Sequence, residues 1–366
     1  MVGGGTPDTT VPSLWNGDIQ WFTPTEVGHQ KYVSKSARTI TQLGLQKSSA
    51  KKLPAGSILL SSRATIGECS IAQRECTTNQ GFQNLIPKND TNNEFLYYLA
   101  QTKKHHFIKY ASGSTFLEIS NSEIRKTKCT VPGTEEQTQI AAFLSALDDR
   151  ISVQNKIIED LKVLKKELCA KLFGSPLCGR IIAIEQVADI YGGYAFNSKA
   201  YVNKGKYKIV TIGNVTGDKY ISGNYNTIDR LPNNIQKPQV LSKGDILVSL
   251  TGNVGRISIV DGDEYLLNQR VAKLGIEDDL TKEYIYQYLS NSSFEKDMIN
   301  AGQGAAQKNI KNQDILSYCI RFPTDQTALE NIDKLLSLYD MRITSEKAIL
   351  SNLILQKSYY LRAMFI

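Results

Sequence analysis

The chain has 366 residues, which is enough for two or three domains with hydrophobic cores of their own. Its 41% apolar and 22% charged residues are ordinary for a soluble globular protein, and no run approaches the roughly 18 apolar residues of a membrane span or the pattern of an export signal. Six scattered cysteines without a C-x2-C pair, together with three histidines, argue against a zinc site and favour a reduced, cytoplasmic protein.

The net charge of +7 is unevenly distributed along the chain. Segments 134–173 and 324–366 together carry 11 basic and 12 acidic residues, which leaves 32 basic and 24 acidic residues for the rest. This excess fits a polyanionic partner such as nucleic acid. A surplus of this size would also serve solubility alone, so charge by itself leaves both interpretations open.

The first globular segment is predicted to be mixed α and β. "SILLSSR" (57–63) and "CSIAQ" (69–73) are typical of two paired strands, with Gly67 at the turn between them. "NEFLYYLAQTKKHHFIKYA" (93–111) has an apolar face at helical spacing, and the glycine-containing tip "SGSTF" (112–116) follows it.

A long helix is predicted next. Its spacings of three and four residues put the apolar side chains on one stripe, as in a coiled coil. No proline or glycine interrupts the run, which spans roughly 50 Å at 1.5 Å per residue, and Gly174-Ser175-Pro176 ends it. The stripe consists of Ile140, Leu144, Leu147, Ile151, Ile158, Leu161, Leu168 and Leu172.

The chain then repeats itself. "AGSILLSSRATIG" (55–67) matches "KGDILVSLTGNVG" (243–255) 188 residues later, and Gly4-Gly5 matches Gly192-Gly193 at the same offset. Asn79-Gln80 matches Asn268-Gln269 with one inserted residue. The second copy again predicts paired strands, "DILVSLT" and "ISIVD", a helical stretch "KEYIYQYLSNSSFEKDMINA" (282–301) and a glycine-rich tip. A small change in the offset between matching segments is expected of loop insertions in a duplicated domain.

A second long helix closes the chain, and its stripe repeats the first at an offset of 192 residues. Both stripes are interrupted at equivalent rungs, Gln154 and Lys165 in one helix and Glu346 and Lys357 in the other. We expect the helices to pack on each other antiparallel, as a rod between two pseudo-twofold-related globular ends. The alternative is that each helix packs on its own domain. The second stripe consists of Ile332, Leu336, Tyr339, Ile343, Leu350, Leu353, Tyr360 and Met364.

With these motifs in place, the chain resembles the specificity subunits of type I restriction–modification systems. "TPDTTVPSLWNGDIQWFTPTEV", "GDILVSLTGNVGRISIV", "TTNQGFQNLIP" and "SGSTFLEISNSEIRKTKCTVP" are similar to parts of their target-recognition domains. "EEQTQIAAFLSALDDRISVQNKIIEDLKVLKKELCAKLF" (135–173) is similar to their first spacer helix, and "IDKLLSLYDMRITSEKAILSNLILQKSYYLRAMF" to the second. The resemblance covers nearly all of the chain.

The resemblance implies an α+β (mixed α/β) fold in four segments: recognition domain 1 (1–133), spacer helix 1 (134–175), recognition domain 2 (176–323) and spacer helix 2 (324–366). One feature departs from the family pattern. The second copy begins with "GRIIAIEQVADIY" (179–191), whereas the first begins almost at its glycine pair, so the matching strand is missing. We expect this difference to affect the stability of domain 1.

Catalytic motifs are absent from the sequence. His105-His106 lies in a lysine-rich helix and is interpreted as surface, and "GGG" at 3–5 lacks the strand and the GK[ST] of a phosphate loop. Asp148-Asp149 resembles a paired carboxylate, but the second copy has Asp340-Met341, so we interpret the pair as a solvated helix face. No S-adenosylmethionine or Walker motif is present. The chain is therefore expected to be non-catalytic and to hold no cofactor.

DNA reading requires cations for phosphates and polar side chains for base edges. The loops at the strand ends and the glycine tips offer such groups, although each could instead cap a turn. Lys31, Lys35, Arg38, Lys204 and Lys206 are candidates for phosphate contacts. The candidate DNA-binding residues are Ser62, Arg63, Thr65, Asn79, Gln80, Ser114 and Thr115 in copy one, and Thr251, Asn253, Arg256, Gln269, Arg270, Lys308 and Asn309 in copy two.

The function implied by the resemblance is the reading of an asymmetric, bipartite site on double-stranded DNA, with the rod setting the unread gap. Two modification (methyltransferase) subunits and the restriction (translocase/nuclease) subunits would be partners, with S-adenosylmethionine and ATP/Mg bound by them. The competing interpretations are a coiled-coil assembly protein with protein-binding ends, a free-standing restriction–modification enzyme, and a silent or recombined specificity gene product.

Overall fold

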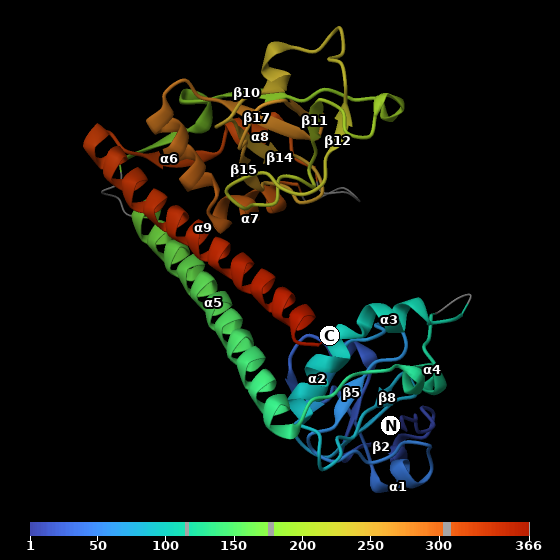
Figure 1. Cartoon of the computed structure of the whole chain (residues 1–366). Helices are drawn as coiled ribbons and strands as arrows, with labels where there is room; N and C mark the ends of the chain where they lie inside the picture. Colours follow the sequence, from blue (N-terminus) through green and yellow to red (C-terminus); the bar gives the residue numbers. More distant parts are fainter. Residues whose placement is uncertain (114–116, 175–178, 303–308, 366) are drawn as a thin grey trace. The chain divides into compact units, whose positions relative to one another are not determined.

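The computed structural model describes residues 1–113, 117–174, 179–302 and 309–365 (Figure 1). The chain forms two compact units: unit 1 comprises residues 1–154 and 349–366, and unit 2 comprises residues 155–348. The boundary between them falls inside both long helices, α5 (Thr134–Gly174) and α9 (Gln326–Ala363). No helix in the described part of the chain is both long and apolar enough to cross a membrane.

Unit 1 is built from short strands and helices around a core that contains Tyr98, Phe95 and Phe82. Its strand orders are β4-β2-β7, β3-β6-β5 and β1-β8. In Figure 1, α2 lies beside β5. The strands are β1 (Val2–Gly3), β2 (Trp15–Phe22), β3 (Tyr32–Val33), β4 (Arg38–Ile40), β5 (Ile58–Leu60), β6 (Cys69–Ala72), β7 (Cys76–Thr78) and β8 (Gln83–Asn84); the helices are α1 (Gln42–Gln46), α2 (Asn93–Thr102), α3 (Lys104–Lys109) and α4 (Asn121–Lys126).

Unit 2 has the strand orders β10-β17-β14-β15, β12-β11-β16-β13 and β18-β9. Its strands are β9 (Arg180–Ala183), β10 (Asp189–Gly192), β11 (Tyr207–Val210), β12 (Asn226–Ile228), β13 (Val240–Leu241), β14 (Ile246–Ser249), β15 (Ile257–Ile259), β16 (Tyr265–Leu267), β17 (Val271–Gly275) and β18 (Cys319–Phe322); its helices are α6 (Asp279–Leu289), α7 (Ser292–Ala301) and α8 (Asn312–Leu316).

The predicted strand pairs are confirmed in both units. β5 pairs antiparallel with β6, and β14 with β15. Gly67 and Gly255 in the connecting loops have φ angles of 84° and 79°, a conformation in which a side chain would be strained. Each stretch predicted as a single helix is instead a pair, α2–α3 and α6–α7, because the chain leaves helical geometry near Lys103 and Asn291.

In unit 1, the first half of α5 packs both on its own domain and on the end of α9. Leu144 and Leu147 are buried in one cluster with Tyr98, and Tyr360 of α9 packs against that cluster. The rings of Phe143 and Tyr360 meet edge to face at 4.9 Å. Both packing arrangements considered from the sequence are thus present together.

Unit 2 has the reciprocal arrangement. Phe173 near the end of α5 is buried with Leu336 of α9, in the cluster that also holds Tyr284 of α6. Within each unit, therefore, the two helices run antiparallel beside one globular α/β domain. Of the predicted packing residues, Leu144, Leu147, Ile158, Leu336 and Leu353 are buried, and Ile151, Leu161, Tyr339, Ile343 and Leu350 are half-buried.

The interpretation of Asp148 as part of a solvated helix face is wrong. Its carboxylate pairs with the Lys357 ammonium at 2.5 Å and accepts a hydrogen bond from the Tyr98 hydroxyl at 2.6 Å. The repeat-equivalent Asp340 pairs with Lys165, also at 2.5 Å. The sequence comparison failed because only the first carboxylate of the Asp-Asp pair is repeated.

The predicted difference at the start of the two copies is visible in the sheets. In unit 2, β9 pairs along its four residues with β18. The stretch of unit 1 equivalent to β18, residues 128–131, forms no strand. Unit 1 begins instead with the two-residue β1, which pairs with β8 as β10 pairs with β17.

Candidate nucleic-acid interface

Three loops of unit 1 that lie far apart in the sequence meet at one edge. The Ser62 carbonyl accepts a hydrogen bond from the Ile119 N–H at 3.0 Å, and the Ser62 N–H donates to the Gly81 carbonyl at 2.9 Å. An isolated antiparallel β-bridge of the backbone also joins Arg63 to Glu118. We call the combined loops 61–68, 79–82 and 117–119 loop edge 1.

The equivalent loops of unit 2 meet in the same way. The Leu250 N–H donates to the Arg270 carbonyl at 3.0 Å, and the Leu250 carbonyl accepts from the Ile310 N–H at 3.0 Å. An isolated antiparallel β-bridge of the backbone joins Thr251 to Asn309. We call loops 249–256, 268–270 and 309–310 loop edge 2. The repeat has therefore preserved the backbone contacts that bring three polar loops together.

The side chains that these edges present to solvent differ between the units. Edge 1 exposes Arg63 and Gln80; edge 2 exposes Asn253, Gln269, Arg270 and Asn309. Arg63 lies 3.7 Å from Glu118, but both side chains are more than 40% exposed, so this pair contributes little and can exchange for another anion. Ser114, Thr115 and Lys308 lie outside the described residues.

Other candidates lie inside their loops. Ser62 is fully buried, and the Asn79 side-chain oxygen accepts the Gly81 N–H. The Thr65 hydroxyl donates to the Pro24 carbonyl, and the Thr251 hydroxyl oxygen is buried. Arg256 pairs with Glu295 of α7 at 3.2 Å. These five shape the loops, and a sequence without burial information could not separate them from the exposed ones.

The candidate phosphate contacts also divide. Lys35 and Lys204 are exposed, and Lys206 lies 3.8 Å from Glu264 in an exposed pair. The Arg38 guanidinium stacks 3.6 Å above the Trp15 ring. Lys31 is only 11% exposed and is held by protein groups, so it is not available to a phosphate.

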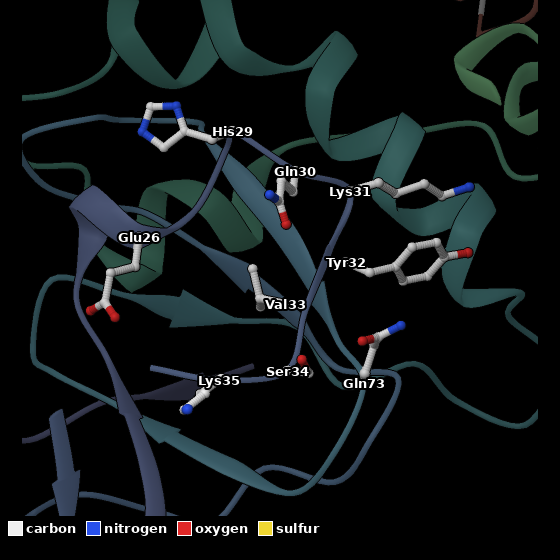
Figure 2. A pocket seen from close by; sticks show the side chains of 9 residues that line it. All are labelled: Glu26, His29, Gln30, Lys31, Tyr32, Val33, Ser34, Lys35 and Gln73. Atoms are coloured by element: carbon white, nitrogen blue, oxygen red, sulfur yellow. The ribbon is translucent and has the colours of Figure 1, made fainter. Parts of the chain in front are cut away.

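A hollow of about 730 Å³ in unit 1 is lined by residues 29–35 together with Glu26 and Gln73 (Figure 2). In this view Lys31 and Tyr32 extend to one side of their segment, while Glu26 and Lys35 lie on the other. The Tyr32 hydroxyl donates to Glu94, and burial together with this bond raises the pKa of Tyr32.

Among the described residues, no group of three or more His, Cys, Asp or Glu side chains could hold a metal ion.

Loop edge 2 depends on a close approach at Gly193. A Cβ added there would lie 2.1 Å from the Asn268 carbonyl oxygen, inside the loop that carries Gln269 and Arg270. We expect Gly193→Ala to lower the free energy of unfolding by about 1–3 kcal/mol, as other overpacked sites do, and to displace this loop.

Chemical denaturation measures the loss, and the neighbouring Gly192 supplies the control. Nothing lies within 4 Å of a Cβ added at Gly192, so Gly192→Ala should change stability by less than about 1 kcal/mol. Equal effects of the two substitutions would contradict the close approach.

Comparison with known proteins places the chain in a family. The sequence profile of the type I restriction modification DNA specificity domain matches residues 2–163 and again 180–354. The chain belongs to this family and contains two copies of its domain. Each copy includes one loop edge and most of one long helix.

Several curated relatives carry the same type of name. The specificity subunit of the type I restriction enzyme MjaIX of Methanocaldococcus jannaschii is 40% identical over 177 residues, which is 47% of this chain and 41% of that protein. The MjaVIII specificity subunit of the same organism is 27% identical over 276 residues, 67% of this chain and 64% of that protein. Each match spans less than two thirds of the relative's length.

Solved structures share the fold over nearly their whole length. The S subunit of a type I restriction–modification system from M. genitalium has a TM-score of 0.55 at 17% identity, covering 100% of this chain and 96% of that one. A chain from a structure on the assembly and conformational transition of the type I R-M system has a TM-score of 0.60 at 17% identity, covering 99% and 94%.

Proposed function

We propose that the chain is the DNA sequence-specificity subunit of a type I restriction–modification complex, in which each unit reads one half of an asymmetric bipartite site. One observation carries this proposal: the same three loops meet in both units through equivalent backbone bonds, yet they expose different polar side chains. A duplicated scaffold with unlike loop residues suits the reading of two unlike half-sites.

The exposed groups have suitable chemistry. Arginine can donate two hydrogen bonds to guanine, and asparagine or glutamine can bind adenine through both a donor and an acceptor in the major groove. Arg63, Arg270 and Gln269 are such groups at the two edges. The surplus of basic residues outside the long helices would bind phosphates and make the affinity fall with salt.

The remaining assignments follow from the same proposal. The chain would be non-catalytic and hold no cofactor, and two modification subunits would dock on the long helices, supplying S-adenosylmethionine chemistry. Restriction subunits using ATP and Mg²⁺ would complete the complex. The family of the chain and the names of its relatives support these partners. The complex would act on cytoplasmic double-stranded DNA.

Replacing the exposed groups of edge 2 tests the proposal. We expect Gln269→Ala combined with Arg270→Ala to relax one half of the methylated motif and to leave the other half unchanged. Each lost base contact should cost about 1–3 kcal/mol in discrimination. Mapping of methylated adenines after co-expression with the modification subunit measures both halves.

Lys334→Ala is the control, because Lys334 is an exposed cation on α9 and does not belong to the loops of edge 2. It should leave both halves of the motif unchanged. Relaxation of both halves by the edge 2 variant, or of neither, would count against half-site reading. Electrophoretic mobility shift of DNA is a second measurement. If the wild-type chain together with the modification subunit does not shift the DNA, an assembly protein would be favoured instead.

A further inference from the structure

A cluster of charged residues in unit 1 joins α5, α9 and α2, and we call it cluster 1. It consists of Lys31, Glu94, Tyr98, Asp148 and Lys357. The Lys31 ammonium donates to Glu94 at 3.0 Å and to the Tyr98 hydroxyl at 3.2 Å. That hydroxyl donates to Asp148, which also holds Lys357. Lys357 and Asp148 are only about one-fifth exposed, at 20% and 22%.

Unit 2 contains the same arrangement, cluster 2, made of Lys219, Glu283, Gln287, Asp340 and Lys165. Lys165 lies 2.5 Å from Asp340, and the Gln287 amide donates to Asp340 at 2.7 Å. Lys219 lies 3.3 Å from Glu283 and 3.6 Å from Asp340. Burial lowers the pKa of Lys219, but these two carboxylates outweigh it and the net pKa is raised.

The two clusters are copies at the offsets of the repeat. Lys31 corresponds to Lys219, and Tyr98 to Gln287. The helix partners are exchanged: Asp148 is on α5 and Lys357 on α9, whereas Lys165 is on α5 and Asp340 on α9. Asp148 and Lys165 are 17 residues apart on α5. Their partners on α9, Lys357 and Asp340, are also 17 residues apart, in the opposite direction along the chain. Both clusters therefore specify one and the same antiparallel register.

Apolar stripes alone do not specify that register, since layers seven residues apart are alike in a heptad pattern. A slip of one heptad in one direction would put Lys165 opposite Lys347. In the other direction, Lys357 would face Ala141 instead of a carboxylate. Either slip therefore leaves at least one half-buried lysine without its partner, which is costly.

We propose that clusters 1 and 2 fix the register of α5 against α9 and so act as positioning residues for the gap between the two half-sites. This inference rests on the proposed function, because the register becomes a gap only if both units read DNA. A heptad slip moves one helix by roughly 10 Å along the other. That displacement corresponds to about three base pairs.

The physical role differs from that of an ordinary stabilising contact. Buried ion pairs often contribute little net stability, and replacing them with neutral side chains of similar size is often tolerated, whereas polar groups in a helical seam can select one register. A neutral version of both clusters should thus remain folded but lose discrimination between gap lengths. If the clusters only supported the structure, the neutral version would instead fail to fold, and any folded protein would keep its discrimination between gap lengths.

The test variant combines Asp148→Asn, Lys357→Met, Lys165→Met and Asp340→Asn in the full chain. The control makes the same kinds of change at exposed sites on the same helices: Asp160→Asn, Lys166→Met, Glu330→Gln and Lys334→Met. Each chain is co-expressed with its modification subunit, and methylated adenines are mapped. Melting by circular dichroism accompanies each sample, and a variant with only the cluster 1 changes serves if the full variant does not fold.

We expect wild type and control to methylate one motif with one gap. The test variant should keep both half-sites but raise methylation at gaps altered by about three base pairs by roughly tenfold or more. A test variant that retains the control's gap discrimination overturns the proposal. So does failure of the cluster 1 variant to fold, because the clusters would then be structural supports.

A second readout separates this proposal from the proposed function. Spin labels at Asp149→Cys and Leu355→Cys, exposed sites on α5 and α9 within unit 1, report the register without DNA once the native cysteines are replaced. One distance is expected in the wild type and an additional population in the neutral variant. A wild type without a bipartite motif would refute DNA reading, whereas unchanged distances in the neutral variant would refute the clusters' role.

Discussion

Replacing Leu336 by alanine should lower the free energy of unfolding by about 2–5 kcal/mol, since the side chain is fully buried and its removal leaves a cavity. Leu336 lies on α9, in the buried cluster of unit 2 that also contains Phe173 of α5 and Tyr284 of α6. The loss would show that the long helix completes the core of this unit.

Urea denaturation followed by circular dichroism measures this effect, with Leu338→Ala as the control on the same helix. Leu338 is 53% exposed, so its replacement should cost less than about 1 kcal/mol. Both tryptophans of the chain, Trp15 and Trp21, lie in unit 1, so their fluorescence reports that unit. Similar losses for the two leucine variants would contradict the burial of Leu336.

Phe173→Ala should be comparably damaging, with an expected loss of about 3–5 kcal/mol. Phe173 lies near the last residue of α5, and its ring is 4.6 Å from that of Tyr288 and 5.7 Å from that of Tyr284. The helix that begins beside the first domain thus ends in the core of unit 2. Truncating this ring would remove that attachment.

Leu164→Ala is the matched control, because Leu164 is on the same helix and 50% exposed. Thermal unfolding should place the Phe173 variant well below the wild type and the Leu164 variant close to it. A Phe173 variant that melts with the wild type would mean that the end of α5 is not part of the core.

Much of the fold could be predicted because the two copies of the duplicated domain still share recognisable segments of sequence. Nearly constant offsets located equivalent strands, and apolar stripes free of proline and glycine predicted both long helices to within a few residues, 134–175 against α5 and 324–366 against α9. The breaks at Lys103 and Asn291 were missed. Nothing in the apolar periodicity marks a helix that stops and restarts without proline or glycine.

The candidate site was only partly predictable. Loop composition pointed to the right loops, but burial decides which side chains face outward, and burial depends on contacts such as Ser62 with Ile119 that join distant segments. The charged clusters illustrate the same limit. Lys165 and Lys357 were visible as interruptions of the stripes, while their partners Asp340 and Asp148 were not recognised because they lie beside the stripe.

The most direct test of the central claim is a genome-wide map of methylated adenines in cells that express the wild-type chain with its modification subunit. The two unlike loop edges predict one asymmetric motif with two different half-sites separated by a gap of fixed length. A palindromic or uninterrupted motif, or no methylation that depends on this chain, would contradict the claim that its two units read two halves of one DNA site.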